Sequence, residues 1–80
     1  MKAVSEELLV QYGFESIEVK QKGIIKTFLK NNFVVVMEQD GLFYYSNVGI
    51  EYPLKNEDDL QKIYLEALRE KLTDDNLAMK

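Results

Sequence analysis

The feature that most constrains the fold is a pair of tight-turn signals on either side of one strongly apolar segment. Asn31-Asn32 and Asp40-Gly41 are residue pairs that favour two-residue hairpin turns. Residues 33–39 between them are rich in β-branched and aromatic side chains, which favour a strand. Further strands are expected at 24–30 and 42–46. The sequence therefore predicts two consecutive hairpins, and hence an antiparallel sheet.

Two-residue turns also predict the strand register, because they fix which residues face each other. The first turn pairs Phe28 with Val35, and the second pairs Met37 with Tyr44. On this register one face carries Ile24, Phe28, Phe33, Val35, Met37, Leu42 and Tyr44, together with Lys26 and Lys30. The other face carries Ile25, Thr27, Leu29, Val34, Val36, Phe43 and Tyr45.

Both predicted faces are largely apolar, whereas an open antiparallel sheet commonly has one face in water. Three arrangements would account for this. The helices of the chain could lie on opposite faces, the sheet could curl and shield its second face, or the second face could bind a partner. The sequence leaves all three open.

The segments that flank the hairpins complete an α+β fold. Ser5 is a favourable N-cap, and a leucine-bearing stripe predicts a short helix over 5–12. Strand-like alternation begins at Ile17, and 50–52 is expected to add an edge strand. Asn56 caps a longer amphipathic helix over 57–72.

We therefore expect a single domain over residues 1–80, with a frayed tail at 73–80. Its fold is predicted to be an antiparallel β-meander of three to five strands between a short N-terminal helix and a longer C-terminal amphipathic helix, in the order α-β-β-β-β-α.

Composition argues against several classes of function. The chain has no histidine and no cysteine, so the usual general base, the cysteine nucleophile and the commonest metal ligands are missing. Its four glycines are isolated and form no phosphate-binding loop. We expect no enzyme activity, no cofactor and no metal.

Charge and hydropathy bear on location and partners. The formal net charge is −4, which is unfavourable for binding phosphates, although Lys20, Lys22, Lys26 and Lys30 form a basic window. Acids stand where a signal peptide would have its apolar region, and no apolar run approaches the roughly 20 residues of a membrane helix. A cytoplasmic protein without membrane contact is expected.

The order of segments resembles that of short uncharacterised proteins encoded by bacterial phages and mobile elements. The resemblance is carried by Tyr12-Gly13-Phe14, by the run from Asp40 to Tyr45, by Tyr52-Pro53-Leu54-Lys55, and by the run from Asp58 to Tyr64. It spans most of the chain and implies no activity. It favours a protein that acts by binding a host or phage protein.

Three functional hypotheses follow. The first is a non-catalytic protein-interaction module that binds a second copy, as a homodimer, or a host or phage protein. Its predicted interaction face consists of Ile24, Phe28, Phe33, Met37, Tyr44, Lys26 and Lys30. The second is a nucleic-acid-binding module that uses Lys26 and Lys30 with the sheet aromatics. The third is an acidic inhibitor or nucleic-acid mimic that uses the acids at the helix termini.

Overall fold

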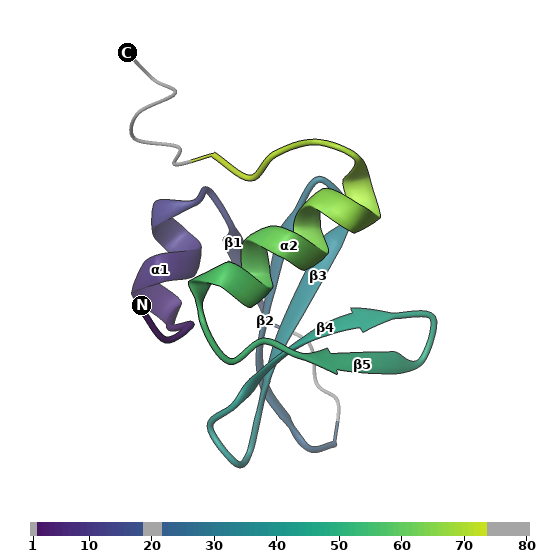
Figure 1. The fold of residues 1–80 in the computed structure, drawn as a ribbon. Helices are drawn as coiled ribbons and strands as arrows, with labels where there is room; N and C mark the ends of the chain where they lie inside the picture. Colours follow the sequence, from purple (N-terminus) through teal and green to yellow (C-terminus); the bar gives the residue numbers. More distant parts are fainter. Residues whose placement is uncertain (1, 19–21, 74–80) are drawn as a thin grey trace.

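The computed structural model describes residues 2–18 and 22–73, and Figure 1 shows their arrangement. The elements follow in the order α1 (Glu6–Gln11), β1 (Glu15–Ile17), β2 (Ile24–Lys30), β3 (Phe33–Glu38), β4 (Phe43–Asn47), β5 (Ile50–Pro53) and α2 (Glu57–Leu68). The strands form one antiparallel sheet in the order β1-β2-β3-β4-β5. The predicted α+β meander between two helices is confirmed. The predicted frayed tail falls largely on residues 74–80, outside the described residues.

Helix α1 begins and ends as its sequence predicts. The Ser5 hydroxyl accepts a hydrogen bond from the backbone N–H of Leu8, 3.2 Å away. At the other end, the N–H of Gly13 bonds to the carbonyl of Val10 and the N–H of Phe14 to that of Leu9, a Schellman ending. This ending turns the chain directly into β1 and brings the Phe14 ring into the core, where 3 % of the residue is exposed.

The turn between β2 and β3 is the predicted two-residue hairpin. Asn31 and Asn32 both have positive φ, at 50° and 69°. Phe28 therefore pairs with Val35 and Lys30 with Phe33, as predicted. Further from the turn, Ile25 is an extra residue, because Ile24 pairs with Glu38 and Lys26 with Met37.

The turn between β3 and β4 corrects the predicted register. The structure pairs Met37 with Phe43 and Val35 with Tyr45, whereas a two-residue turn would pair Met37 with Tyr44. Of the loop residues only Gly41 has positive φ, at 81°, and its N–H bonds to the carbonyl of Glu38. This is the three-residue loop, a turn followed by a left-handed glycine, rather than the two-residue one.

The shift by one residue moves every β4 side chain to the opposite face. Phe43 and Tyr45 thereby join the face of β2 and β3 that the helices cover. The core cluster contains the sheet residues Phe28, Phe33, Val35, Phe43 and Tyr45 together with Leu8, Leu9, Leu60 and Tyr64 from the helices. Both helices therefore lie on the same face, as Figure 1 also shows. The first of the three predicted arrangements, helices on opposite faces, is wrong.

An aromatic group forms the centre of this core. The Phe33 ring stacks on the Tyr45 ring with centroids 4.1 Å apart and planes 6° from parallel. Phe33 also contacts the rings of Phe14 and Tyr64, with centroids 6.0 Å and 5.0 Å away. Since β3, β4, α2 and the segment before β1 each contribute one ring, the group links the sheet to its helical cover.

Helix α2 ends one turn earlier than predicted. Its last residue is Leu68, and Arg69 takes a left-handed conformation with φ of 59°. The chain then runs back across the top of the helices in Figure 1. Leu72, predicted as part of the helical stripe, reaches the core as a non-helical residue with 2 % of its surface exposed. Burial of this leucine compensates for the strained backbone at Arg69.

The turn between β4 and β5 contains a residue that is poorly suited to its backbone. Val48 and Gly49 have φ of 49° and 79°, and Val48 is 93 % exposed. A β-branched residue is disfavoured at positive φ, where asparagine is tolerated. We expect Val48→Asn to stabilise the domain by about 1 kcal/mol, or about 4–8 °C in Tm, measured by thermal unfolding.

The control for this prediction is Val48→Ile, which keeps the β-branch and should leave Tm unchanged. Because the side chain at position 48 is exposed, neither substitution removes a packing contact. A gain from isoleucine as large as that from asparagine would contradict the backbone explanation.

Candidate functional site

The predicted interaction face does not form one exposed surface. Phe28 and Phe33 are 1 % and 0 % exposed, and Met37 packs against the same core. Tyr44 lies on the opposite face, because it pairs with Val36 in the corrected register. Ile24 lies with Tyr44 on that opposite face, since it pairs with Glu38 beyond the bulge.

The two lysines of that prediction hold helix α1 to the sheet. The ammonium group of Lys26 forms an ion pair with Glu6, and that of Lys30 donates to the backbone carbonyl of Tyr12. Both lysines are therefore on the helix-covered side, next to α1. Lys20, part of the same basic window, lies outside the described residues.

The other face of the sheet presents two rows that cross all five strands. We call it the open face. The first row is Ile17, Thr27, Val36, Tyr44 and Pro53, and the second is Glu15, Leu29, Val34, Ser46 and Glu51. Glu38 continues the face on β3, next to Ile24. In the part of the chain that the structure describes, no helix lies on this face.

The centre of the open face is shielded by its own neighbours. Thr27 and Val36 are 5 % and 3 % exposed, although neither belongs to the core cluster beneath the helices. Leu29, Val34 and Tyr44 around them are half-buried. A twisted sheet brings such cross-strand neighbours together. The open face is thus an apolar strip that is partly solvent-exposed.

Acidic groups surround this strip. Glu15 and Glu51 lie at the two ends of the second row, on the edge strands β1 and β5. At the β3–β4 loop, the Tyr44 hydroxyl donates to the Asp40 carboxylate over 3.0 Å. The pKa of Tyr44 is raised, chiefly because the phenol proton is held by this hydrogen bond. Among the described strand residues, this face has three glutamates and no lysine or arginine.

The Glu51 carboxyl acts on Glu38. The pKa of Glu38 is raised above its ordinary value of 4.5, first by a hydrogen bond with the Glu51 carboxyl and then by desolvation and by the charges of Glu51 and Asp40. The folded chain therefore binds a proton at Glu38 more tightly than the unfolded chain does. The bound proton therefore stabilises the folded state at pH below 4.5. This stabilisation is lost as the pH rises through the raised pKa of Glu38.

We expect Glu51→Gln to move the pKa of Glu38 back toward its ordinary value, because the competing carboxylate is removed. A carboxyl-carbon NMR titration of the folded protein measures this shift. Glu7→Gln, an exposed position on α1, is the matched control and should leave Glu38 unchanged. An unaltered Glu38 titration in Glu51→Gln would show that the two carboxyls do not interact.

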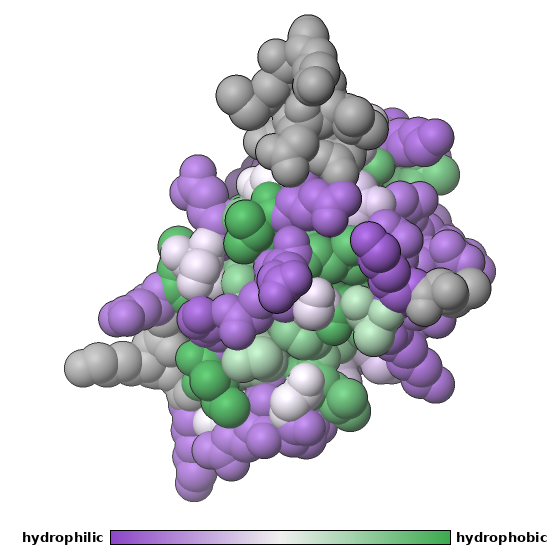
Figure 2. All heavy atoms as spheres, turned by 90° about the vertical axis from the view of Figure 1, so that its left-hand side faces the viewer, coloured by the Kyte–Doolittle hydropathy of each residue, from purple (hydrophilic) through white to green (hydrophobic). Residues whose placement is uncertain are grey.

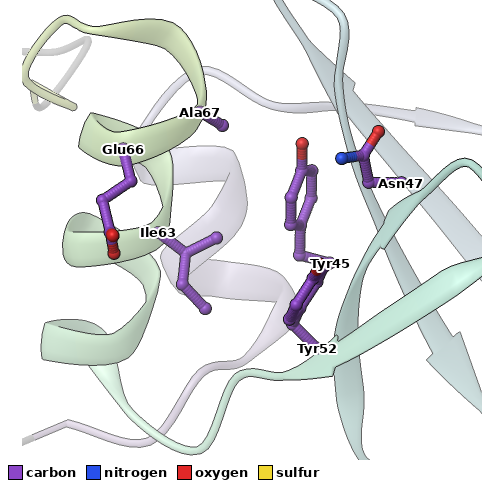
Figure 3. A pocket seen from close by; sticks show the side chains of 6 residues that line it. All are labelled: Tyr45, Asn47, Tyr52, Ile63, Glu66 and Ala67. Atoms are coloured by element: carbon purple, nitrogen blue, oxygen red, sulfur yellow. The ribbon is translucent and has the colours of Figure 1, made fainter.

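A concave surface lies on the helix side, where the β4–β5 hairpin extends past α2. It is a groove of about 440 Å³ lined by Tyr45, Asn47, Tyr52, Ile63, Glu66 and Ala67. Figure 3 shows the two tyrosine rings on one wall, with Ile63 and Ala67 projecting from α2 on the other. The Tyr45 and Tyr52 rings stack with centroids 5.8 Å apart, and Tyr52 is 41 % exposed.

Edge strand β5 limits how a partner could add to that side of the sheet. The backbone N–H of Leu54 bonds to the carbonyl of Phe43. Because hydrogen-bonded and non-hydrogen-bonded pairs alternate in an antiparallel ladder, the backbone N–H and C=O positions of Glu51 and Pro53 point away from β4, toward the outer edge. Pro53 has no N–H, so this outer edge offers few donors for a further strand. The faces of the sheet, rather than its β5 edge, are therefore the surfaces to consider.

Comparison with known proteins places the chain in no family. A scan of family models and searches of curated proteins and of solved structures find no match.

Two further observations concern the described residues. No group of three or more acidic, histidine or cysteine side chains among them is arranged to hold a metal ion. None of their helices is long and apolar enough to cross a membrane.

On the side of the molecule where α1 lies, apolar residues gather near the middle, with hydrophilic side chains around and across them (Figure 2). Val10, on α1, is 61 % exposed.

Sequence reasoning missed the acidic border of the open face because it assigned no register to the edge strands, which carry Glu15 and Glu51. It also misplaced β4: with the two-residue turn, Tyr45 would stand opposite Val36, a position that Tyr44 takes in the structure. The signal that could have revealed the longer loop is Asp40 itself. Its side chain accepts the N–H of Leu42 at 2.9 Å as well as the Tyr44 hydroxyl, which favours a turn with a single left-handed residue.

Proposed function

We propose that this chain is a non-catalytic module that binds another protein through the open face of its sheet. The observation that carries the proposal is the apolar strip of the open face, which crosses all five strands without a covering helix in the described residues. Apolar strips on a small domain are commonly contact surfaces, because leaving them in water is unfavourable.

The charges on the open face favour a different protein as the partner, rather than a second copy of this chain or a nucleic acid. Two open faces brought together would oppose Glu15, Glu38 and Glu51 of each copy within a chain of net charge −4. The same acids repel phosphates, and Lys26 and Lys30 are engaged with α1 on the other side. The resemblance to phage-encoded proteins is in keeping with a host or phage protein as the partner.

The proposal is tested by making the strip more polar while keeping residues that favour a strand. Leu29→Thr with Val34→Thr keeps strand-forming residues at two half-buried positions. The full chain, the double variant and the control Val10→Thr would be immobilised, and partners captured from cells that encode the chain would be purified. We expect at least one captured partner to bind the double variant with an affinity about tenfold or more below its affinity for the full chain. Its affinity for the control should equal that for the full chain.

Circular dichroism of the double variant must show a folded domain, so that a loss of binding reports on the surface. Sedimentation of the free chain at micromolar concentration should show a monomer. Equal affinity of all three proteins for every purified partner, or a dimer that the double substitution dissociates, would contradict the proposal.

A further inference from the structure

The open face also indicates the chemistry of its partner. We propose, as a consequence of the proposed function, that the open face binds a basic amphipathic segment: an apolar stretch with lysine or arginine near both of its ends. The proposal rests on the position of the acids relative to the apolar strip.

The acids are distributed on both sides of the strip. Glu15 lies on β1 and Glu51 on β5, the two edge strands of the sheet, with Leu29 and Val34 between them in the same row. Glu15 and Glu51 are both exposed. A segment that crosses the strands along this row would therefore meet a carboxylate, then Leu29 and Val34, then the small polar Ser46, then a carboxylate.

The geometry of the sheet sets the spacing of the cationic groups. Neighbouring strands lie about 4.8 Å apart, so the row from β1 to β5 is about 20 Å long. About 13 residues of helix, at about 1.5 Å each, span that length. The partner segment is thus expected to have basic residues roughly 13 positions apart with an apolar stripe between them.

Among the described residues, Glu15, Glu38 and Glu51 form no ion pair with a lysine or arginine. Lys26 and Lys30, the lysines of β2, are both on the helix-covered side. At one end of the face Glu38 and Glu51 are close enough to share a hydrogen bond. A cation from a partner placed there relieves like-charge repulsion in addition to forming an ion pair. The apolar strip alone would not discriminate between partners, whereas its acidic ends select against acidic and uncharged ones.

The test uses two synthetic helix-forming peptides with the same leucine stripe, one with lysine and the other with glutamate at the polar positions near its ends. Each is titrated into the isotopically labelled full chain at low and at high salt, and backbone amide shifts are recorded. We expect the lysine peptide to shift the amides of Leu29, Val34 and Ser46, and to bind more weakly as salt rises. The glutamate peptide should produce no such shifts.

Variants assign the effect to the open face. Glu15→Gln and Glu51→Gln should each weaken the lysine peptide by a factor of about 1.5 to 5, as expected for exposed ion pairs. Glu7→Gln and Asp58→Gln, exposed acids at the N-termini of α1 and α2, should have no effect. Shifts confined to the helix N-termini, or equal binding by all variants, would overturn the inference.

The outcome separates this inference from the proposed function. If Leu29→Thr with Val34→Thr weakens a natural partner while Glu15→Gln and Glu51→Gln leave its affinity and salt dependence unchanged, the open face binds a protein but the charge argument is wrong. If the polar double variant has no effect on any partner, the proposed function itself fails.

Discussion

Replacing Phe33 by alanine is expected to cost the domain most of its stability. Phe33 is 0 % exposed and its ring contacts those of Phe14, Tyr45 and Tyr64. Truncating a buried phenylalanine typically costs about 3–5 kcal/mol, because apolar contacts are lost and a cavity is left. A chain of this length is stable by only about 4–12 kcal/mol, so the variant should be partly unfolded or close to it.

Urea unfolding followed by far-ultraviolet circular dichroism measures this loss. Phe33→Leu fills part of the cavity and should unfold at a midpoint between those of alanine and the native residue. Leu42→Ala, at a position that is 57 % exposed, should leave the midpoint nearly unchanged. If Phe33→Ala unfolded at the same midpoint as Leu42→Ala, the aromatic group would not be the centre of the core.

Leu72→Ala is expected to cost about 2–4 kcal/mol, although the residue lies outside every helix and strand. Leu72 is 2 % exposed and belongs to the same core cluster as Phe33 and Tyr64. Its burial depends on the left-handed residue Arg69, which turns the chain back over the helices. Loss of this leucine should therefore release the segment that follows α2.

Leu65→Ala is the matched control, because Leu65 is on α2 itself but 50 % exposed. The free energy of unfolding of Leu65→Ala should differ from that of the unsubstituted chain by less than about 0.5 kcal/mol. Chemical denaturation of both variants gives the comparison. A cost for Leu65→Ala that equals or exceeds that for Leu72→Ala would mean that α2 continues as a helix and presents a different stripe to the core.

Much of the fold follows from local sequence signals. Ser5 and Asn56 cap their helices, and Asn31-Asn32 forms the predicted turn, since each of these effects depends only on neighbouring backbone groups. The end of α2 was not predictable in the same way. No glycine marks it, and the burial of Leu72 in the tertiary structure outweighs the helical preference of the residues around Arg69.

The candidate site was predictable only in part. The sequence indicated an excess of apolar sheet residues and predicted a partner-binding face. Which β4 residues belong to that face depended on a single choice of loop length at Asp40-Gly41, because a shift of one residue exchanges the two faces of β4. The predicted face also included Phe28 and Phe33, which the helices cover, whereas Glu15 and Glu51 on the edge strands were overlooked.

The central claim is that both helices cover one face of the sheet and leave the other open. Nuclear Overhauser effects between side-chain protons of the full chain test it most directly. We expect contacts from the Phe33 and Tyr45 rings to Tyr64 and Ile63 on α2. We expect none from Val36 or Tyr44 to Leu8, Leu60 or any other helix residue. Contacts from Tyr44 or Val36 to either helix would contradict the register, and with it the open face.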